Sequence, residues 1–343
     1  MKSKLLLSAL TMILVLMTGC KGKGMSLLPT ASGSAYEVLV VMDNNLLKGE
    51  VGREIKEVLT SDVPGLPQAE PQFRVSTVST NHFDKILKPV RNIFIVETGE
   101  LYTQPKFSFA RNVWAEGQVI LYLKAPDAKS LETFIPENAQ TIIDFFVNSE
   151  MNRVVKVLKD SYNQDASQQL AELLGVEMRI PTDLSQIQKK KDFFWISNNQ
   201  YQGRMDIVVY SVPYTESDAF SPEKILARRD SIMKLNIPGA YEGTYMTTQK
   251  FLAPSFREMN LGGKYTGEMR GLWEIAGDVM GGPFVSHTRL DEANQRIITA
   301  EAFIYAPEKE KRNMLRKMEA ALYTLKLPQE NMLPEVPVTV SQQ

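Results

Sequence analysis

Cysteine is nearly absent from this chain, since only Cys20 occurs among its 343 residues. A single cysteine forms no disulfide within the chain and supplies no cluster of thiolate ligands for a metal. Histidine is almost as scarce, with His82 and His287 about 200 positions apart. A histidine-based zinc site needs clustered ligands, so we expect no metal at either residue. We expect both histidines at the surface or in a hydrogen bond.

Common catalytic motifs are also missing. No Gly-x-Ser-x-Gly elbow is present, and the glycine-rich segment 261–267 lacks the Walker spacing. We therefore predict no catalytic residue, no metal site and no cofactor. Acidic pairs such as Glu97 with Glu100, or Glu268 with Glu274, leave one enzymatic alternative open. This alternative is a carboxylate-dependent hydrolase that acts on cell-wall or dietary glycans.

Residues 1–19 are typical of a lipoprotein signal peptide. Two early lysines precede the apolar run 5–17, whose length of about 13 residues is shorter than a membrane-spanning helix. Thr18 and Gly19 stand directly before Cys20, as in the lipobox of bacterial lipoproteins, although Met17 departs from the usual leucine. We expect the thiol of Cys20 to carry lipid, with acyl chains such as palmitate, and the bilayer to be a partner.

Residues 20–34 predict a flexible lipidated tether, because they are rich in glycine, serine and other small residues. The tether would keep the body on the order of 20 Å from the membrane. Residues 21–24 contain no acid, whereas an acidic run at this point directs some lipoproteins to the cell surface. We expect a location in the cell envelope, at the outer membrane and facing the periplasm.

The charges of the chain are almost balanced, with 39 basic and 40 acidic residues. Removing the leader with Lys2 and Lys4 leaves 37 basic residues and a net charge of −3. This balance argues against a nucleic-acid partner, since such binding depends on neutralising phosphates. Hydrophobic residues make up 43% of the chain, which is enough for a sizeable core.

The sequence of the body predicts an α+β fold with antiparallel or mixed sheets and helices packed on one face. Short apolar runs alternate with helical patterns, as expected for such a fold. The length favours two lobes, with residues 35–163 in the first, residues 164–327 in the second, and a loose proline-containing tail at 328–343. Similar element order in the halves leaves a duplicated unit open. One continuous domain with a central helix pair is the other alternative.

Several local signals give sharper predictions. Gly175 is placed to end a helix in the left-handed conformation, and Ser221 followed by Pro222 is placed to start one. Pro307 predicts the start of the last helix. Two hairpins are expected around the loops 198–203 and 291–295.

The densest unusual region is the pair of segments 268–275 and 280–287. It suggests a ligand groove in which Trp273 stacks on a sugar or peptide while Arg270 binds a carboxylate. Glu274 and His287 complete this candidate site. The alternative is a plain strand pair with Trp273 in the core and glycines where the backbone bends.

The body contains the stretches 65–73, 91–93, 270–273, 280–285 and 303–307. Together they resemble an uncharacterised lipoprotein family of the Bacteroidota, catalogued as a domain of unknown function. The resemblance covers nearly the whole body, implies an envelope lipoprotein and brings no catalytic residues. We therefore predict a membrane-anchored, non-enzymatic module that binds an envelope protein or glycan.

Overall fold

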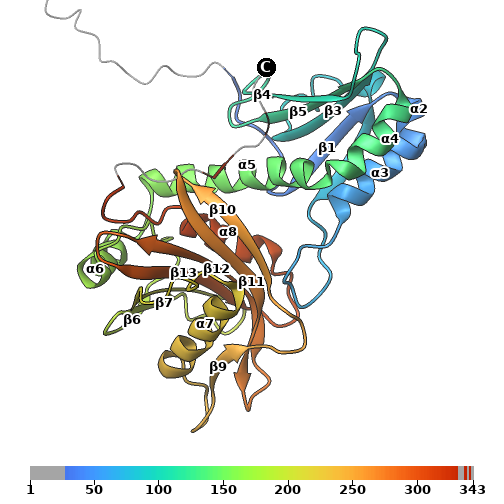
Figure 1. The fold of residues 1–343 in the computed structure, drawn as a ribbon. Coiled ribbons are helices and arrows are strands. Elements are labelled where there is room, and N and C mark those ends of the chain that lie inside the picture. Colours follow the sequence, from blue (N-terminus) through green and yellow to red (C-terminus); the bar gives the residue numbers. More distant parts are fainter. Residues whose placement is uncertain (1–27, 331–335, 338–339, 341–343) are drawn as a thin grey trace, which may run out of the picture.

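The computed structural model describes residues 28–330, 336–337 and 340, which form two lobes (Figure 1). Each lobe has its own β-sheet, and the long helix α5, Ala139–Asp160, runs between them. This architecture confirms the predicted α+β fold class. Cys20 and the predicted leader lie outside the described residues. None of the described helices could span a bilayer.

The sheet of the N-terminal lobe is mixed, with strand order β2-β1-β3-β5-β4. Its first four strands run parallel, and β4 runs antiparallel to β5 at one edge. β4 is not predicted from the sequence, because the alternation of Phe107 and Phe109 with polar residues is short. The strands are β1 Glu37–Met42, β2 Arg74–Ser79, β3 Asn92–Thr98, β4 Lys106–Arg111 and β5 Val119–Ala125.

Helices cover one face of this sheet, as predicted. Phe145 and Phe146 of α5 pack in the core between helices and sheet, where Phe146 contacts Phe73 and Phe94. The opposite face carries a smaller apolar cluster that includes Trp114. The shorter helices are α2 Asn44–Lys48, α3 Glu50–Thr60 and α4 Ala128–Glu137, with a 3₁₀ turn at Thr80–His82.

The C-terminal lobe is built on an antiparallel sheet of eight strands, with order β10-β11-β12-β13-β8-β7-β6 and β9 paired to β11. Both predicted hairpins are confirmed, since β7 pairs with β8 and β12 pairs with β13. The strands are β6 Gln186–Lys190, β7 Phe193–Ser197, β8 Arg204–Pro213, β9 Tyr245–Thr248, β10 Ser255–Leu261, β11 Lys264–Ala276, β12 Gly281–Asp291 and β13 Arg296–Tyr305.

This second sheet has helices on both faces, unlike the first. Apolar residues of α6, Gln164–Leu174, and α8, Arg312–Leu322, pack on one face. Those of α7, Pro222–Asn236, pack on the other. The two lobes therefore differ in strand direction and in layers, and they are not copies of one unit.

Two of the three predicted helix ends are confirmed. Gly175 adopts φ +65° at the end of α6, and the Ser221 side chain accepts from Lys224 N at the start of α7. The prediction that Pro307 starts the last helix is wrong, because α8 begins at Arg312. Its first amides are capped by Glu70 of the other lobe, whose carboxylate accepts from the Lys311 and Arg312 amides at 2.7 and 2.8 Å.

Candidate functional site

A cleft of about 390 Å³ lies at the junction of the lobes, lined by α5, α8, the start of β10 and the middle of β11. Figure 1 shows α5 passing over α8 and β10 at this junction. Junctions between lobes are common positions for ligand sites. The lining takes side chains from both lobes and mixes apolar residues with a larger number of polar and charged ones. Its polar side chains include Gln72, Gln140, Asp144, Asn148, Arg257, Glu268, Arg270, Arg316 and Glu319.

Strand and helix periodicity together place the charged groups of the cleft. Glu268 and Arg270 are two residues apart on β11, so both point to the face covered by α8. Glu319 lies on the inner face of α8, one turn after Leu315, and is fully buried. The sheet and the helix therefore deliver opposite charges to the same point.

Arg270 is the centre of this charge cluster. Its Nε donates to Glu268 Oε1 at 2.8 Å and its Nη1 donates to Glu319 Oε2 at 3.1 Å. Arg257 Nη2 donates to Glu268 Oε2 at 3.1 Å. Two guanidinium groups thus face two carboxylates, and the cluster of these four side chains has no net charge.

The electrostatics favour the ionised forms of Glu268 and Arg270. Burial by itself would raise the pKa of Glu268, but Arg270, His287 and Arg257 hold it well below its usual range. Burial would lower the pKa of Arg270, yet Glu268 and Glu319 raise it well above its usual value. A carboxylate as acidic as Glu268 does not act as a proton donor near neutral pH. Glycoside hydrolysis by Glu268 and a second carboxylate would need one of the two groups as a proton donor, and Glu268 does not fit that role.

His287 lies beneath the cleft, in an environment that the sequence did not lead us to expect. It is fully buried, and neither ring nitrogen has a hydrogen-bond partner among the described residues. Its Nε2 lies 3.6 Å from Glu268 Oε2, and its ring meets Tyr323 edge-to-face at 4.8 Å. The expectation of a surface or hydrogen-bonded residue is therefore wrong for His287. It is correct for His82, which is exposed and whose Nδ1 lies 2.8 Å from Ser79 Oγ.

Glu268, His287 and Glu319 form a cluster that the sequence did not reveal, with potential ligand atoms all within 4.8 Å of one another. Such a set resembles a metal site, and the charges around it decide whether a metal ion could bind there. Arg270 already donates to both carboxylates. A divalent cation would have to displace this guanidinium and would add two positive charges beside Arg257. The cluster therefore fits arginine better than a metal ion.

Comparison with known proteins gives two families whose function is unknown. Residues 31–159 match the family described as Domain of unknown function (DUF8532), and residues 163–324 match Domain of unknown function (DUF4837). Both lobes thus match uncharacterised families. No curated protein matches the chain.

Two solved structures show weak similarity. One is a point mutant of protein Mog1, with 7% identity, a TM-score of 0.27, and coverage of 42% of this chain and 82% of that one. The other is the Saccharomyces cerevisiae Ran-binding protein Mog1p, with 9% identity, a TM-score of 0.28, and coverage of 44% and 86%.

The four residues predicted to line one groove are not all brought together. Arg270 and His287 share the α8 face of the sheet, since His287 pairs with Glu268 across the strands. Glu274 lies further along that face and is not part of the cleft lining. Trp273 points to the opposite face, is 3% exposed and donates through Nε1 to the Ile304 carbonyl at 3.2 Å. Trp273 is therefore a core residue of a strand pair, which was the alternative to a ligand groove.

Trp273 also borders a smaller pocket of about 260 Å³ on its own face of the sheet. Trp195, Phe303 and Tyr305 provide further aromatic lining. The polar group there is already satisfied, because Asp206 Oδ1 accepts from Trp195 Nε1 at 2.9 Å and from the Arg204 guanidinium at 3.1 Å. This pocket therefore offers mainly apolar contact.

Sequence reasoning missed Glu268 and Glu319 as partners of Arg270. Two signals were available in the sequence. A Glu-x-Arg pair on one strand puts both charges on the same face. A glutamate four residues after Leu315 interrupts the apolar face of a helix, which is unusual unless the charge is paired. Neither signal shows that the strand and the helix meet.

Proposed function

We propose that this chain is a lipid-anchored envelope protein whose two-lobed body binds a ligand in the cleft between the lobes. The observation that carries the proposal is the composition of that cleft. Hydrogen-bonding side chains from both lobes converge on one cavity of about 390 Å³, and the three acidic and three basic residues among its described lining balance in charge. This arrangement is suited to holding a polar ligand in a fixed orientation.

The chemistry of the cleft favours binding over hydrolysis. Glu268 and Glu319 share Arg270 as a partner, and neither is available as a proton donor or nucleophile while that pairing lasts. Gln140 and Asn148 offer amide groups, and Phe256 offers an aromatic surface. A segment of an envelope protein or glycan, with many donors and acceptors and little net charge, matches this lining.

The proposed anchor is Cys20, which precedes the described residues. The apolar leader and the small residues before Cys20 support lipidation, as does the resemblance to Bacteroidota envelope lipoproteins. The absence of acidic residues at 21–24 supports the periplasmic face of the outer membrane. The body would then lie within reach of periplasmic partners.

Replacing Cys20 with serine tests the anchor. The wild-type protein should remain with membranes after a high-salt wash, because acyl chains hold it independently of charge, whereas Cys20→Ser should be released. Cell fractionation followed by immunoblotting measures both. Retention of the Cys20→Ser protein after the wash would refute lipidation as the anchor.

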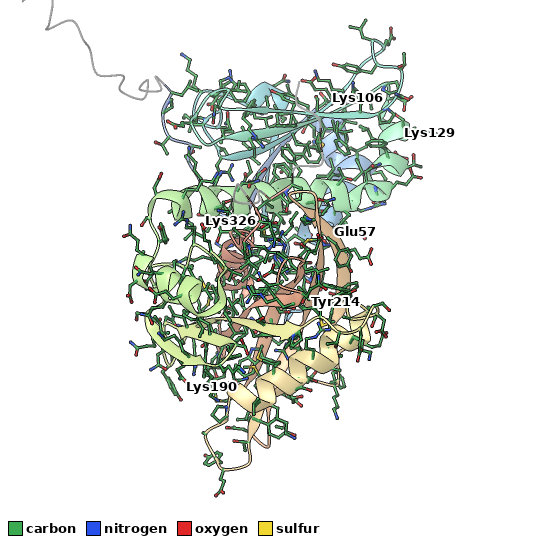
Figure 2. The ribbon with its side chains drawn as sticks, turned by 60° about the vertical axis from the view of Figure 1, so that its left-hand side comes forward. Glu57, Lys106, Lys129, Lys190, Tyr214 and Lys326 are labelled. Atoms are coloured by element: carbon green, nitrogen blue, oxygen red, sulfur yellow. The ribbon has the colours of Figure 1, made fainter. Side chains whose placement is uncertain are left out.

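A photoreactive amino acid at Gln140, on the rim of the cleft, tests ligand binding in intact cells. We expect a discrete cross-linked species from this position. The matched control is Lys129, an exposed residue of α4 on the side of the N-terminal lobe (Figure 2). Equal cross-linking from Lys129, or none from Gln140, would contradict a ligand site in the cleft.

A further inference from the structure

A second cavity, of about 540 Å³, lies between α5 and the loop 111–119 and has a different character from the cleft. Among its described lining residues, four side chains are cationic and one, that of Glu116, is acidic. The cations are Arg111, Arg153, Lys156 and Lys159. This cavity, here called the basic pocket, therefore attracts anions.

Arg153 forms a fixed wall of the basic pocket. Its guanidinium donates to the carbonyls of Gly117 and Arg91, at 2.9 Å each, and pairs with Glu150. Arg111 and Lys156 are exposed, and neither forms an ion pair with another described residue. These two side chains can meet an incoming anion without breaking an ion pair of the folded protein.

The basic pocket adjoins the first described residues of the chain. The Glu116 amide donates to the Pro29 carbonyl at 2.7 Å, and the Ala31 amide donates to the Glu116 carbonyl at 2.9 Å. Only eight positions separate Leu28 from Cys20 in the sequence. Eight residues reach at most about 28 Å when fully extended. An anchor at Cys20 would therefore keep this side of the body close to the membrane.

Exposed apolar side chains accompany the charges. Val157 is 62% exposed and follows Lys156 on α5. Val113 is 39% exposed in the loop that lines the basic pocket, and Leu28 is 36% exposed at the start of the described chain. Basic residues mixed with exposed apolar ones are typical of surfaces that rest on a membrane interface.

We propose that the basic pocket binds the phosphate groups of membrane lipid headgroups and holds the N-terminal lobe against the membrane. This inference rests on the proposed function, because the anchor at Cys20 is what would turn the basic pocket toward the membrane. Charge complementarity and the short connection to Cys20 select a lipid headgroup as the occupant. Surface charges act within about 10 Å at moderate salt, so the pocket must lie near the bilayer to contribute.

The test uses the full chain with Cys20→Ser, so that acylation plays no part. Sedimentation with phosphatidylcholine vesicles containing phosphatidylglycerol should show binding that weakens as salt is raised. Adding Arg111→Gln and Lys156→Gln should weaken this binding roughly 30-fold, from about fivefold per cation lost near an anionic surface. Thermal unfolding of both proteins should coincide, because neither residue is buried.

The matched control carries Lys189→Gln and Lys191→Gln, which remove the same charge at exposed positions. These residues flank Lys190, at the end of the C-terminal lobe far from the N-terminal lobe (Figure 2). The control should bind vesicles like its parent. Equal weakening in the control would show a general charge effect and overturn the proposal.

Two further results would overturn it. One is equal binding to vesicles of pure phosphatidylcholine, which would indicate apolar contact alone. The other is a rise in melting temperature with inorganic phosphate but no vesicle binding, which would make free phosphate the ligand. Failure of the anchor is distinguishable, because it appears only in the salt-washed cell fractions and leaves the vesicle assay unaffected.

Discussion

Two arginine–glutamate clusters of the C-terminal lobe show how differently the same pair of groups is used. Arg229 of α7 pairs with Glu301 of β13 inside the lobe, and their side chains are 1% and 0% exposed. Arg270 of β11 pairs with Glu268 and Glu319 at the junction of the lobes, and its side chain is 16% exposed. The first cluster is enclosed by one lobe, while the second borders the cleft.

The groups around each carboxylate decide its electrostatic outcome. Burial raises the pKa of Glu301, and the single Arg229 does not reverse this effect, to which Asp230 adds. Burial acts on Glu268 in the same direction, but Arg270, His287 and Arg257 outweigh it and the pKa falls well below its usual range. We conclude that Glu301 is ionised only at an electrostatic cost, whereas the surroundings of Glu268 favour its ionised form.

The largest effect is expected for Arg229→Met. This change leaves Glu301 buried without its cation, which should lower the free energy of unfolding by about 3–5 kcal/mol. Urea unfolding followed by tryptophan fluorescence measures it, because Trp195 and Trp273 lie in the apolar cluster beside α7. Adding Glu301→Met should restore most of the loss, since an apolar pair needs no counter-charge. A single variant as stable as wild type would contradict an enclosed, mutually dependent pair.

A smaller loss is expected for Arg270→Met, roughly 2 kcal/mol in the same assay. Glu268 keeps Arg257 as a partner, and Glu319, which loses its arginine, lines the cleft with Glu268, so that water can enter the vacated position. Arg229→Met is the matched comparison, because it removes the same groups from an enclosed position. A loss as large as that of Arg229→Met would mean that the cleft does not hydrate the cluster.

The smallest effects should appear in the pH dependence of stability, with opposite signs for the two glutamates. The folded pKa of Glu268 is depressed, so its contribution is present above the unfolded value of about 4.3 and is lost as pH falls toward the folded pKa. The folded pKa of Glu301 is raised, so folding gains stability as pH falls through that value toward about 4.3.

Urea unfolding of Glu268→Gln and Glu301→Gln across pH 3 to 7 separates the two contributions. The advantage of wild type over Glu268→Gln should shrink in acid, and that over Glu301→Gln should grow. The same slope in both comparisons would show that the surroundings of Glu268 and Glu301 do not shift their pKa values in opposite directions.

Much of the fold could be predicted because the deciding interactions are local. Gly175 ends α6 and Ser221 caps α7 through contacts within a few residues, and both hairpins follow from apolar runs around a polar loop. Trp273 as a core residue also follows from strand alternation. The alternation in β4 is weak, so its formation depends on pairing with β5. The helices on both faces of the second sheet likewise depend on contacts with distant parts of the chain.

The candidate site could be predicted only in fragments. Arg270 and His287 stand out in the sequence, but Glu319 reaches Arg270 across 49 positions when α8 packs on the sheet. Nothing in the neighbours of any of these residues specifies that contact. The same packing brings Glu268 and Glu319 close to His287, which no pattern in the sequence around His287 indicates.

The sequence by itself determined the α+β class, most strands and helix ends, the near balance of charge and the scarcity of thiols and histidines. Only the tertiary structure decided where α8 begins, since Glu70 caps it from 241 positions away. It also decided that Arg270 of the cleft meets two carboxylates, while Arg111 and Lys156 of the basic pocket form no ion pair with another described residue. Local propensity acts over a few residues, whereas burial and counter-charges depend on which surfaces of the folded chain meet.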